Sequence, residues 1–314
     1  MKKALLALAA AALLPGAANA QAACDRACLA GKLDIFLKAV VAKDPARAGL
    51  WVGFRQTENA LLTVPGEGIW ASNTGIGLDR RYYDAETGQA EFYGTINEGA
   101  KAAVASVRIR VEDGQVTEAE WHLARADDPG IAGVGSKATY DLDNLLANAP
   151  AARVVPAAQR LPRRQLVAAV NSYFDGIVDG TGRNIQANPG CLRFENGMGG
   201  QNWNSRPAQP SEADWQATVD CRSGYAGLGI VNVAARRYLM VDEEAQVVVA
   251  SAVFIRDPLN PKRRGLFMEL FYLDGGKISS VYAAIVYPSP LAPLPNWAPY
   301  EGNFPIPQNL VPHS

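Results

Sequence analysis

The chain has 314 residues, a formal net charge of −1 and a charged-residue content of 19%. This balance excludes the strongly basic composition that nucleic-acid binding or charge-driven attachment to an anionic membrane requires. The length is sufficient for two domains with separate hydrophobic cores.

The N-terminus has the pattern of a secretory signal peptide. Lys2 and Lys3 precede an apolar run over residues 4–14, and Ala18-Asn19-Ala20 forms a small-x-small cleavage site. We expect cleavage after Ala20 and a soluble protein that is exported to the periplasm or secreted. A lipoprotein acylated at Cys24 is the less favoured alternative, because residues 21–23 fit such processing poorly.

Four cysteines in an exported chain predict disulfides rather than a metal site. We favour a bond between Cys191 and Cys221, which would close the weakly patterned insertion between them. Cys24 and Cys28 are four residues apart on a predicted helix, and they either bond to each other or stay free.

The first half of the mature chain begins with an amphipathic helix and continues into predicted strands. Apolar residues recur at helical spacing from Leu29 to Val41, and Asp44-Pro45 ends the helix. The sequence FRQTENA follows at residues 54–60, RRYYDAETGQA begins at Arg80, and VRIRVEDGQVTEAEWHLA forms a predicted hairpin.

The second half repeats these features in the same order. Its helix has apolar residues from Leu166 to Ile177, and LRFENG, RRYLMVDEEAQV and ELFYLDGGKISSVYAAIV are the counterparts of the three later segments. Four matched features predict an internal duplication. We therefore expect a first domain over residues 21–126, a linker over 127–162 with one helical turn near Leu142 to Leu146, and a second domain over 163–287.

The remaining residues, 288–314, are rich in proline but keep several large apolar side chains. A disordered tail would rarely retain so many apolar residues. We expect an extended strap that lies across one domain.

A helix followed by strands that end in a long hairpin indicates an α+β domain in which helices pack in a curved antiparallel sheet. Each copy resembles the nuclear transport factor 2-like (SnoaL-like) fold, which is a cone of this kind. CDRACL at the start, the Asp-Pro after the first helix, Thr-Glu-Asn and DGQVTEAEWHLAR further resemble a family of secreted fungal and bacterial proteins with no assigned function. The resemblance implies the fold and a pocket, but it assigns no catalytic residue.

The first predicted hairpin provides the candidate active site. Asp113-Gly114 favours a two-residue turn, and an unbroken register from that turn places Glu118, Glu120 and His122 on the same face as Val107, Ile109 and Val111. Two carboxylates and an imidazole in a partly dry cup are suited to general acid/base catalysis.

A shift of one residue reverses this arrangement. Glu118 and Glu120 would then lie beside Arg108 and Arg110 as a solvated charge ladder, and His122 would lie on the surface. We regard this structural alternative as the better-founded interpretation of His122.

In the second hairpin, Ser280, Tyr282 and Ala284 replace the two acids and the histidine, and Glu269 replaces Val107. The second cup therefore either binds something different through Glu269 and Tyr282 or supports the first cup structurally.

Other polar and aromatic residues have two interpretations. The repeated Glu-Asn is better explained by a Glu paired with the preceding Arg and an Asn that turns the chain than by a ligand site. Several aromatic residues either line a cup or fill an ordinary core, with the core favoured: Trp51, Trp70, Tyr82, Tyr83 and Trp203.

The sequence contains no spacing typical of a metal site, a phosphate-binding loop or a hydrolase nucleophile. We therefore predict a cofactor-independent pocket protein, with lyase or isomerase activity of the dehydratase type on a small organic molecule in the first cup. The alternative is a non-catalytic module that binds a ligand or a protein. We expect a monomer in which the two copies pack together as a dimer would.

Overall fold

The computed structural model describes residues 24–199, 221–222, 225, 228–257, 259, 262–289 and 297. The predicted signal peptide, Trp203 and most of the predicted strap lie outside these residues. None of the described helices has the length and apolar content needed to cross a bilayer.

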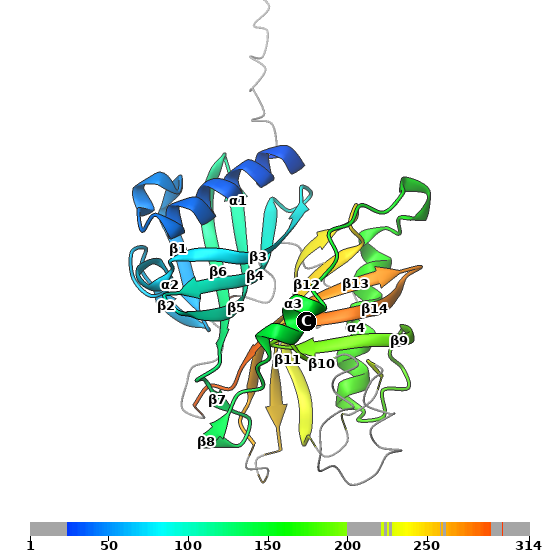
Figure 1. Cartoon of the computed structure of the whole chain (residues 1–314). Helices are drawn as coiled ribbons and strands as arrows, with labels where there is room; N and C mark the ends of the chain where they lie inside the picture. Colours follow the sequence, from blue (N-terminus) through cyan, green and yellow to red (C-terminus); the bar gives the residue numbers. More distant parts are fainter. Residues whose placement is uncertain are drawn as a thin grey trace, which may run out of the picture.

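The first half folds as one long helix on a six-stranded sheet, which we call the N-terminal unit (Figure 1). The helix α1 spans Arg26–Val41, and its buried side chains pack on the sheet. The sheet order is β2-β1-β6-β5-β4-β3. The elements are η1 (Pro45–Arg47), β1 (Leu50–Glu58), β2 (Leu61–Thr63), α2 (Ile69–Ser72), β3 (Gly75–Asp84), β4 (Gln89–Glu98), β5 (Lys101–Glu112) and β6 (Gln115–Arg125).

The second half, which we call the C-terminal unit, repeats this order with the sheet β10-β9-β14-β13-β12-β11. Its helix α4 spans Arg163–Val178 and covers one face of the sheet. The strands are β9 (Ala187–Glu195), β10 (Met198–Gly199), β11 (Ile230–Asp242), β12 (Val247–Arg256), β13 (Gly265–Asp274) and β14 (Lys277–Val286). The shared strand order agrees with the predicted duplication.

The segment between the units contains β7 (Pro129–Gly130), β8 (Gly133–Lys137), α3 (Leu142–Ala147) and η2 (Ala157–Gln159). The helical turn that the sequence predicts in this segment is confirmed by α3. The strand order of the two sheets does not test where the chain divides into folding domains, so the boundaries at residues 126 and 162 stay a prediction.

Both units agree with the predicted cone of helix and curved sheet, with two corrections. The strands β1 and β6 pair in parallel, as do β9 and β14, so each sheet is mixed rather than antiparallel throughout. Each described sheet also carries one long helix rather than several. The parallel pairing arises because each first strand returns beside the last strand of its own unit.

The repeated asparagines show how closely the two backbones agree. Asn59 and Asn196 both adopt positive φ, at 49° and 50°. Asn59 exchanges side-chain hydrogen bonds with the backbone of Leu123, and Asn196 does so with Ile285. This confirms that the asparagines turn the chain. The predicted Arg pairing holds for Glu195 and Arg193, whereas Glu58 contacts Arg125 instead.

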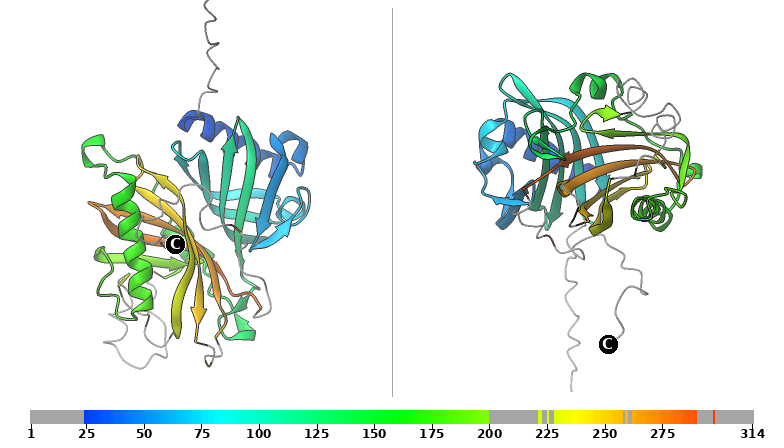
Figure 2. Two further views of the ribbon diagram at one scale, coloured as in Figure 1. Left: turned by 180° about the vertical axis from the view of Figure 1, so that it is seen from behind. Right: turned by 90° about the horizontal axis from the view of Figure 1, so that it is seen from below.

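The helix-free faces of the two sheets pack against each other, so the layers run helix, sheet, sheet, helix (Figure 2). Strand β6 packs on β14 and β3 on β11, which joins each strand to its own counterpart, as a twofold axis would. Three separate clusters of buried side chains result: one under α1, one under α4 and one between the sheets.

Two disulfides are formed. Cys191 bonds to Cys221, as predicted, and Cys24 bonds to Cys28, which decides the alternative left open by the sequence.

Candidate functional site

The predicted turn of the first hairpin is present, but the register changes three residues after it. Glu112 pairs with Gln115 and Val111 with Val116, as expected, whereas Arg110 pairs with Glu118. The extra residue is Thr117, whose hydroxyl donates to the carbonyl of Arg110. This β-bulge turns every later side chain of β6 to the opposite face.

The prediction that Glu118, Glu120 and His122 point into the N-terminal cup is therefore wrong. They share a face with Arg108 and Arg110, as in the alternative register. That alternative was also incomplete, because the face is not solvated: Glu120 and His122 are each only 1% exposed. The C-terminal unit covers them.

The covered face holds a buried ion pair between the units. Arg237 of β11 donates to both carboxylate oxygens of Glu120, and the Nη1–Oε2 distance is 2.7 Å. Burial alone would raise the pKa of Glu120, but the guanidinium of Arg237 and the nearby imidazole of His122 hold it well below the usual carboxyl value. The His122 Nε2 lies 3.6 Å from Glu120. These groups join the two sheets and are buried between the units.

The space between α1 and its sheet, which we call the N-terminal cup, contains mainly apolar side chains. At its centre, the adjacent strand positions Phe92, Val107 and Trp121 are all fully buried, and Phe36 of α1 lies 6.0 Å from Trp121, measured between ring centroids. Trp70 is also buried here and donates its indole N–H to Gln56. The acid on this face is Glu58 of β1, beside Trp121, where it accepts from the backbone N–H of Ile69 and pairs with Arg125.

The corresponding space between α4 and its sheet, which we call the C-terminal cup, differs at the same positions. The register aligns Phe92, Val107 and Trp121 with Ala250, Glu269 and Ala283. Glu269 is thus a carboxyl between two small side chains, on the helix-covered face of the sheet, and is 2% exposed.

Glu269 lacks a strong partner among the described residues. Its Oε2 has no hydrogen-bond partner there. Burial and the nearby Glu195 together raise the pKa of Glu269 to about 8, because Arg193 opposes them only in part. The side chain is therefore mostly a neutral carboxylic acid at pH 7, able to donate a hydrogen bond.

Other polar groups surround Glu269 in the C-terminal cup. Arg193 of β9 lies 3.8 Å from Glu195 and stacks over the ring of Tyr225, with its guanidinium carbon 4.8 Å from the ring centroid. Tyr173 of α4 interacts with Arg193 and Tyr225, and burial raises its pKa well above the usual value. By the strand register, Arg193 occupies the position of Gln56 in the N-terminal unit.

The other predicted pocket residues are dispersed. Tyr282 lies on the opposite face of the sheet from Glu269 and stacks on Phe194 between the units, so the two do not form one site. Tyr82 is also buried between the units, Tyr83 is half-buried beneath Arg26, and Trp51 is 47% exposed.

Sequence reasoning missed Arg193, Tyr173 and Tyr225 as neighbours of Glu269. Comparison of the copies contained a signal for Tyr173, because it replaces Phe36 in an otherwise apolar helix stripe. Tyr225 follows the insertion and has no matched position, so nothing in the sequence marked it. Among the described residues, no group of three His, Cys, Asp or Glu side chains is placed to hold a metal ion.

Comparison with known proteins assigns no activity to the chain. Residues 159–285, less than half of the chain, match the family described as "Domain of unknown function (DUF8021)". A search of curated proteins found no match.

Three solved structures are similar to parts of the chain. NTF2-like proteins of unknown function from Cytophaga hutchinsonii and Burkholderia xenovorans are 15% and 13% identical, cover 30% and 33% of this chain and 88% and 89% of their own, and have TM-scores of 0.26 and 0.27. A protein of unknown function with a cystatin-like fold from Methylobium petroleophilum is 15% identical, covers 45% of this chain and 99% of its own, and has a TM-score of 0.30. At these scores we base the fold on the observed strand order.

Proposed function

We propose that the protein binds a small, neutral organic molecule in the C-terminal cup, where Glu269 donates a hydrogen bond to an oxygen of the ligand. The observation that carries this proposal is the replacement of Phe92, Val107 and Trp121 by Ala250, Glu269 and Ala283 at matched positions. The same backbone has lost two large aromatic side chains and gained a buried carboxyl.

The chemistry of the cup favours a neutral ligand with a carbonyl or hydroxyl group. A buried carboxyl with an unpartnered oxygen loses hydrogen bonding to water, and a ligand acceptor or donor would restore it. An anionic ligand would be repelled once Glu269 ionises. Small-molecule sites typically combine an apolar wall with a few directed polar groups, and Tyr173, Phe271 and Glu269 provide both.

Proton transfer is a second candidate function of the same cup, supported by the raised pKa of Glu269. A group that titrates near neutral pH can remove a proton beside a carbonyl and return it elsewhere, as lyases and isomerases require. This activity replaces the one predicted for the first cup, which the register of β6 does not support.

Export also remains a proposal. Two disulfides are typical of proteins from oxidising compartments, and this supports the secretory signal that the sequence predicts.

Ligand-observed NMR tests the binding proposal. The parent protein is screened against neutral ketones, alcohols and amides by saturation-transfer difference, alongside an Ala283→Trp variant that restores the bulk of the N-terminal cup. We expect compounds that bind the parent and lose their signal with Ala283→Trp. Val52→Ala, at a 96% exposed position, is the control and should bind as the parent does.

Equal signals from the parent and Ala283→Trp would contradict binding in this cup. Compounds that bind are then incubated in D₂O, and exchange of their carbon-bound protons in the parent but not in Glu269→Gln would support proton transfer.

A further inference from the structure

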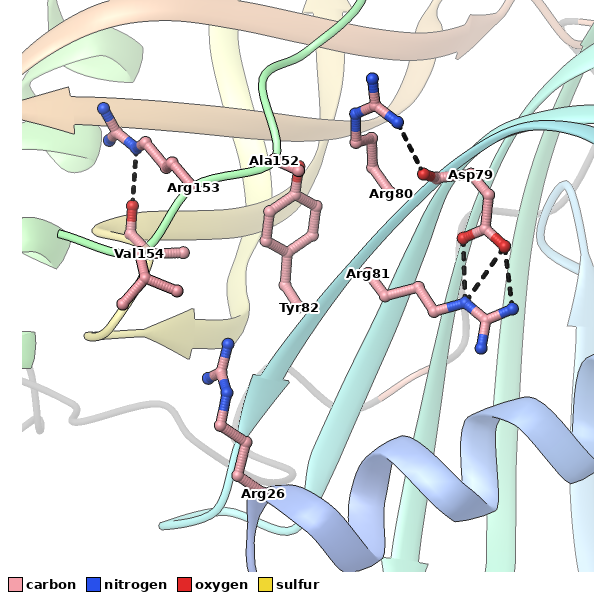
Figure 3. A pocket seen from close by; sticks show the side chains of 9 residues that line it. Arg26, Asp79, Arg80, Arg81, Tyr82, Ala152, Arg153 and Val154 are labelled. Carbon is pink, nitrogen blue, oxygen red and sulfur yellow. Dashed lines mark hydrogen bonds and ion pairs between the residues drawn. The ribbon is translucent and has the colours of Figure 1, made fainter.

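A second site lies between the two units, apart from the C-terminal cup. It is a groove of about 470 Å³ between β3, the linker at residues 152–154 and Ala245. Figure 3 shows Arg26, Arg80 and Arg153 arranged around Tyr82, while Arg81 turns toward Asp79. Four of the nine lining residues are arginines, and Asp79 is the one acid among them.

Three of the four arginines have carboxylate partners. Arg26 lies 2.8 Å from Asp242 and 3.7 Å from Glu244. Arg81 pairs with Asp79 and Asp34, and Arg153 pairs with Asp274. These cations are at least partly neutralised by the protein itself.

Arg80 is different, because its hydrogen bonds within the described residues go to backbone carbonyl oxygens. The acceptors are Pro150 and Asp79, and no described carboxylate forms an ion pair with it. Carbonyl dipoles orient the guanidinium of Arg80 and satisfy some of its donors, but they do not neutralise its positive charge. The side chain is half-buried at the groove.

The duplication explains why Arg80 lacks an acid. Arg80 aligns with Arg237 through Tyr93 and Ser251, and Tyr282 aligns with Glu120 through the hairpin register. Arg237 reaches across to Glu120, so the matching contact would join Arg80 to position 282. Position 282 carries a tyrosine, and Arg80 is near enough to act on its pKa. The carboxylate present on one side of the pseudo-twofold is missing on the other.

We propose that the groove binds a small organic carboxylate, whose charged group takes the place of the missing acid beside Arg80. A planar guanidinium binds a carboxylate through two parallel hydrogen bonds, and Arg26 and Arg153 add positive charge from separate segments. Tyr82, Ala152, Val154 and Ala245 would contact a short apolar body attached to that group.

Isothermal titration with succinate, benzoate and inorganic phosphate at low salt tests this proposal on the full-length protein. We expect benzoate or succinate to bind the parent with a Kd of about 1 mM or tighter. Arg80→Gln should weaken that binding at least about tenfold, because it removes the unpaired charge. Tyr282→Glu should weaken it similarly, because it provides Arg80 with an internal carboxylate.

Arg47→Gln is the matched control, since Arg47 is an exposed arginine outside the groove and should leave the Kd unchanged. The proposal is overturned if neither carboxylate binds, if phosphate alone binds, or if Arg80→Gln and Arg47→Gln have equal effects. Circular dichroism of each variant verifies folding, and Arg80→Gln alone decides the outcome if Tyr282→Glu does not fold.

Discussion

The two units share a backbone but place their buried glutamates on opposite faces of their sheets. The N-terminal unit has an apolar cup and concentrates charge on the face between the units, where Glu120 and His122 are buried. The C-terminal unit places Glu269 and Arg193 in its cup, and its counterpart face carries Tyr282 and Leu270. The same fold therefore tolerates a buried glutamate on either face of its sheet, and the face that carries it differs between the two copies.

This contrast distinguishes a carboxyl that holds the two units together from one that is available to a ligand. Glu120 is buried with a bidentate partner, which explains its low pKa without any ligand. Glu269 is buried with no comparable partner, and its pKa is raised. Carboxyls that remain unpaired in a cup are the better candidates for function, because keeping them costs stability.

Breaking the ion pair between the units should have the largest effect on stability. Glu120→Ala leaves Arg237 buried and unpaired, and we expect a loss of about 3–5 kcal/mol in the free energy of unfolding. Urea unfolding followed by circular dichroism measures it. The double variant Glu120→Met, Arg237→Met should be less destabilised than Glu120→Ala.

The matched control is Glu112→Ala on the same hairpin, where an exposed carboxylate pairs with Arg110. Its effect should stay below about 1 kcal/mol. Similar losses for Glu112→Ala and Glu120→Ala would show that burial of the pair does not set its importance.

Exchanging the central residues of the two cups should have a smaller effect. Val107→Glu places a carboxyl between the large side chains of Phe92 and Trp121, and we expect a loss of about 1–3 kcal/mol. Glu269→Val should leave stability unchanged or raise it at pH 8. Thermal unfolding of both variants measures the difference, and equal losses would argue that the cups are equivalent.

The sequence predicted the elements well because helical periodicity, turn residues and repetition are local signals. The helix at Leu29 to Val41, the helical turn in the linker, the Asp113-Gly114 turn and the bond between Cys191 and Cys221 are all present. The duplication also aligned Glu269 with Val107 correctly.

The predicted active site was wrong because of one extra residue, Thr117, in β6. Val116 and Ala119 are both buried against the N-terminal cup although three positions separate them, which strict alternation forbids. The same break occurs between Ile278 and Val281, where Ser279 takes the role of Thr117. A repeated irregularity in the apolar pattern was therefore the available signal for the bulge.

Contacts between the units could not be predicted from local patterns in the sequence. Nothing in the order of residues connects Arg237 to Glu120, because 117 positions separate them and the pairing depends on how two sheets stack. The missing acid beside Arg80 depends in the same way on the strand register and on how the two units pack. The monomeric state likewise stays a prediction.

The most direct test of the account is a carboxyl-carbon NMR titration of Glu269, assigned by comparison with Glu269→Gln. We predict a midpoint near 8, well above the usual carboxyl value of 4.5. Because the folded state then holds the proton more tightly than the unfolded chain, stability should fall as the pH rises from about 4.5 to about 8 and level off above. The part of this fall that Glu269 contributes should be absent in Glu269→Gln, whereas Glu91, whose pKa burial also raises, keeps its own contribution. A midpoint between about 4 and 5 would contradict the account, because it would show that Glu269 is solvated or paired and not poised for a ligand.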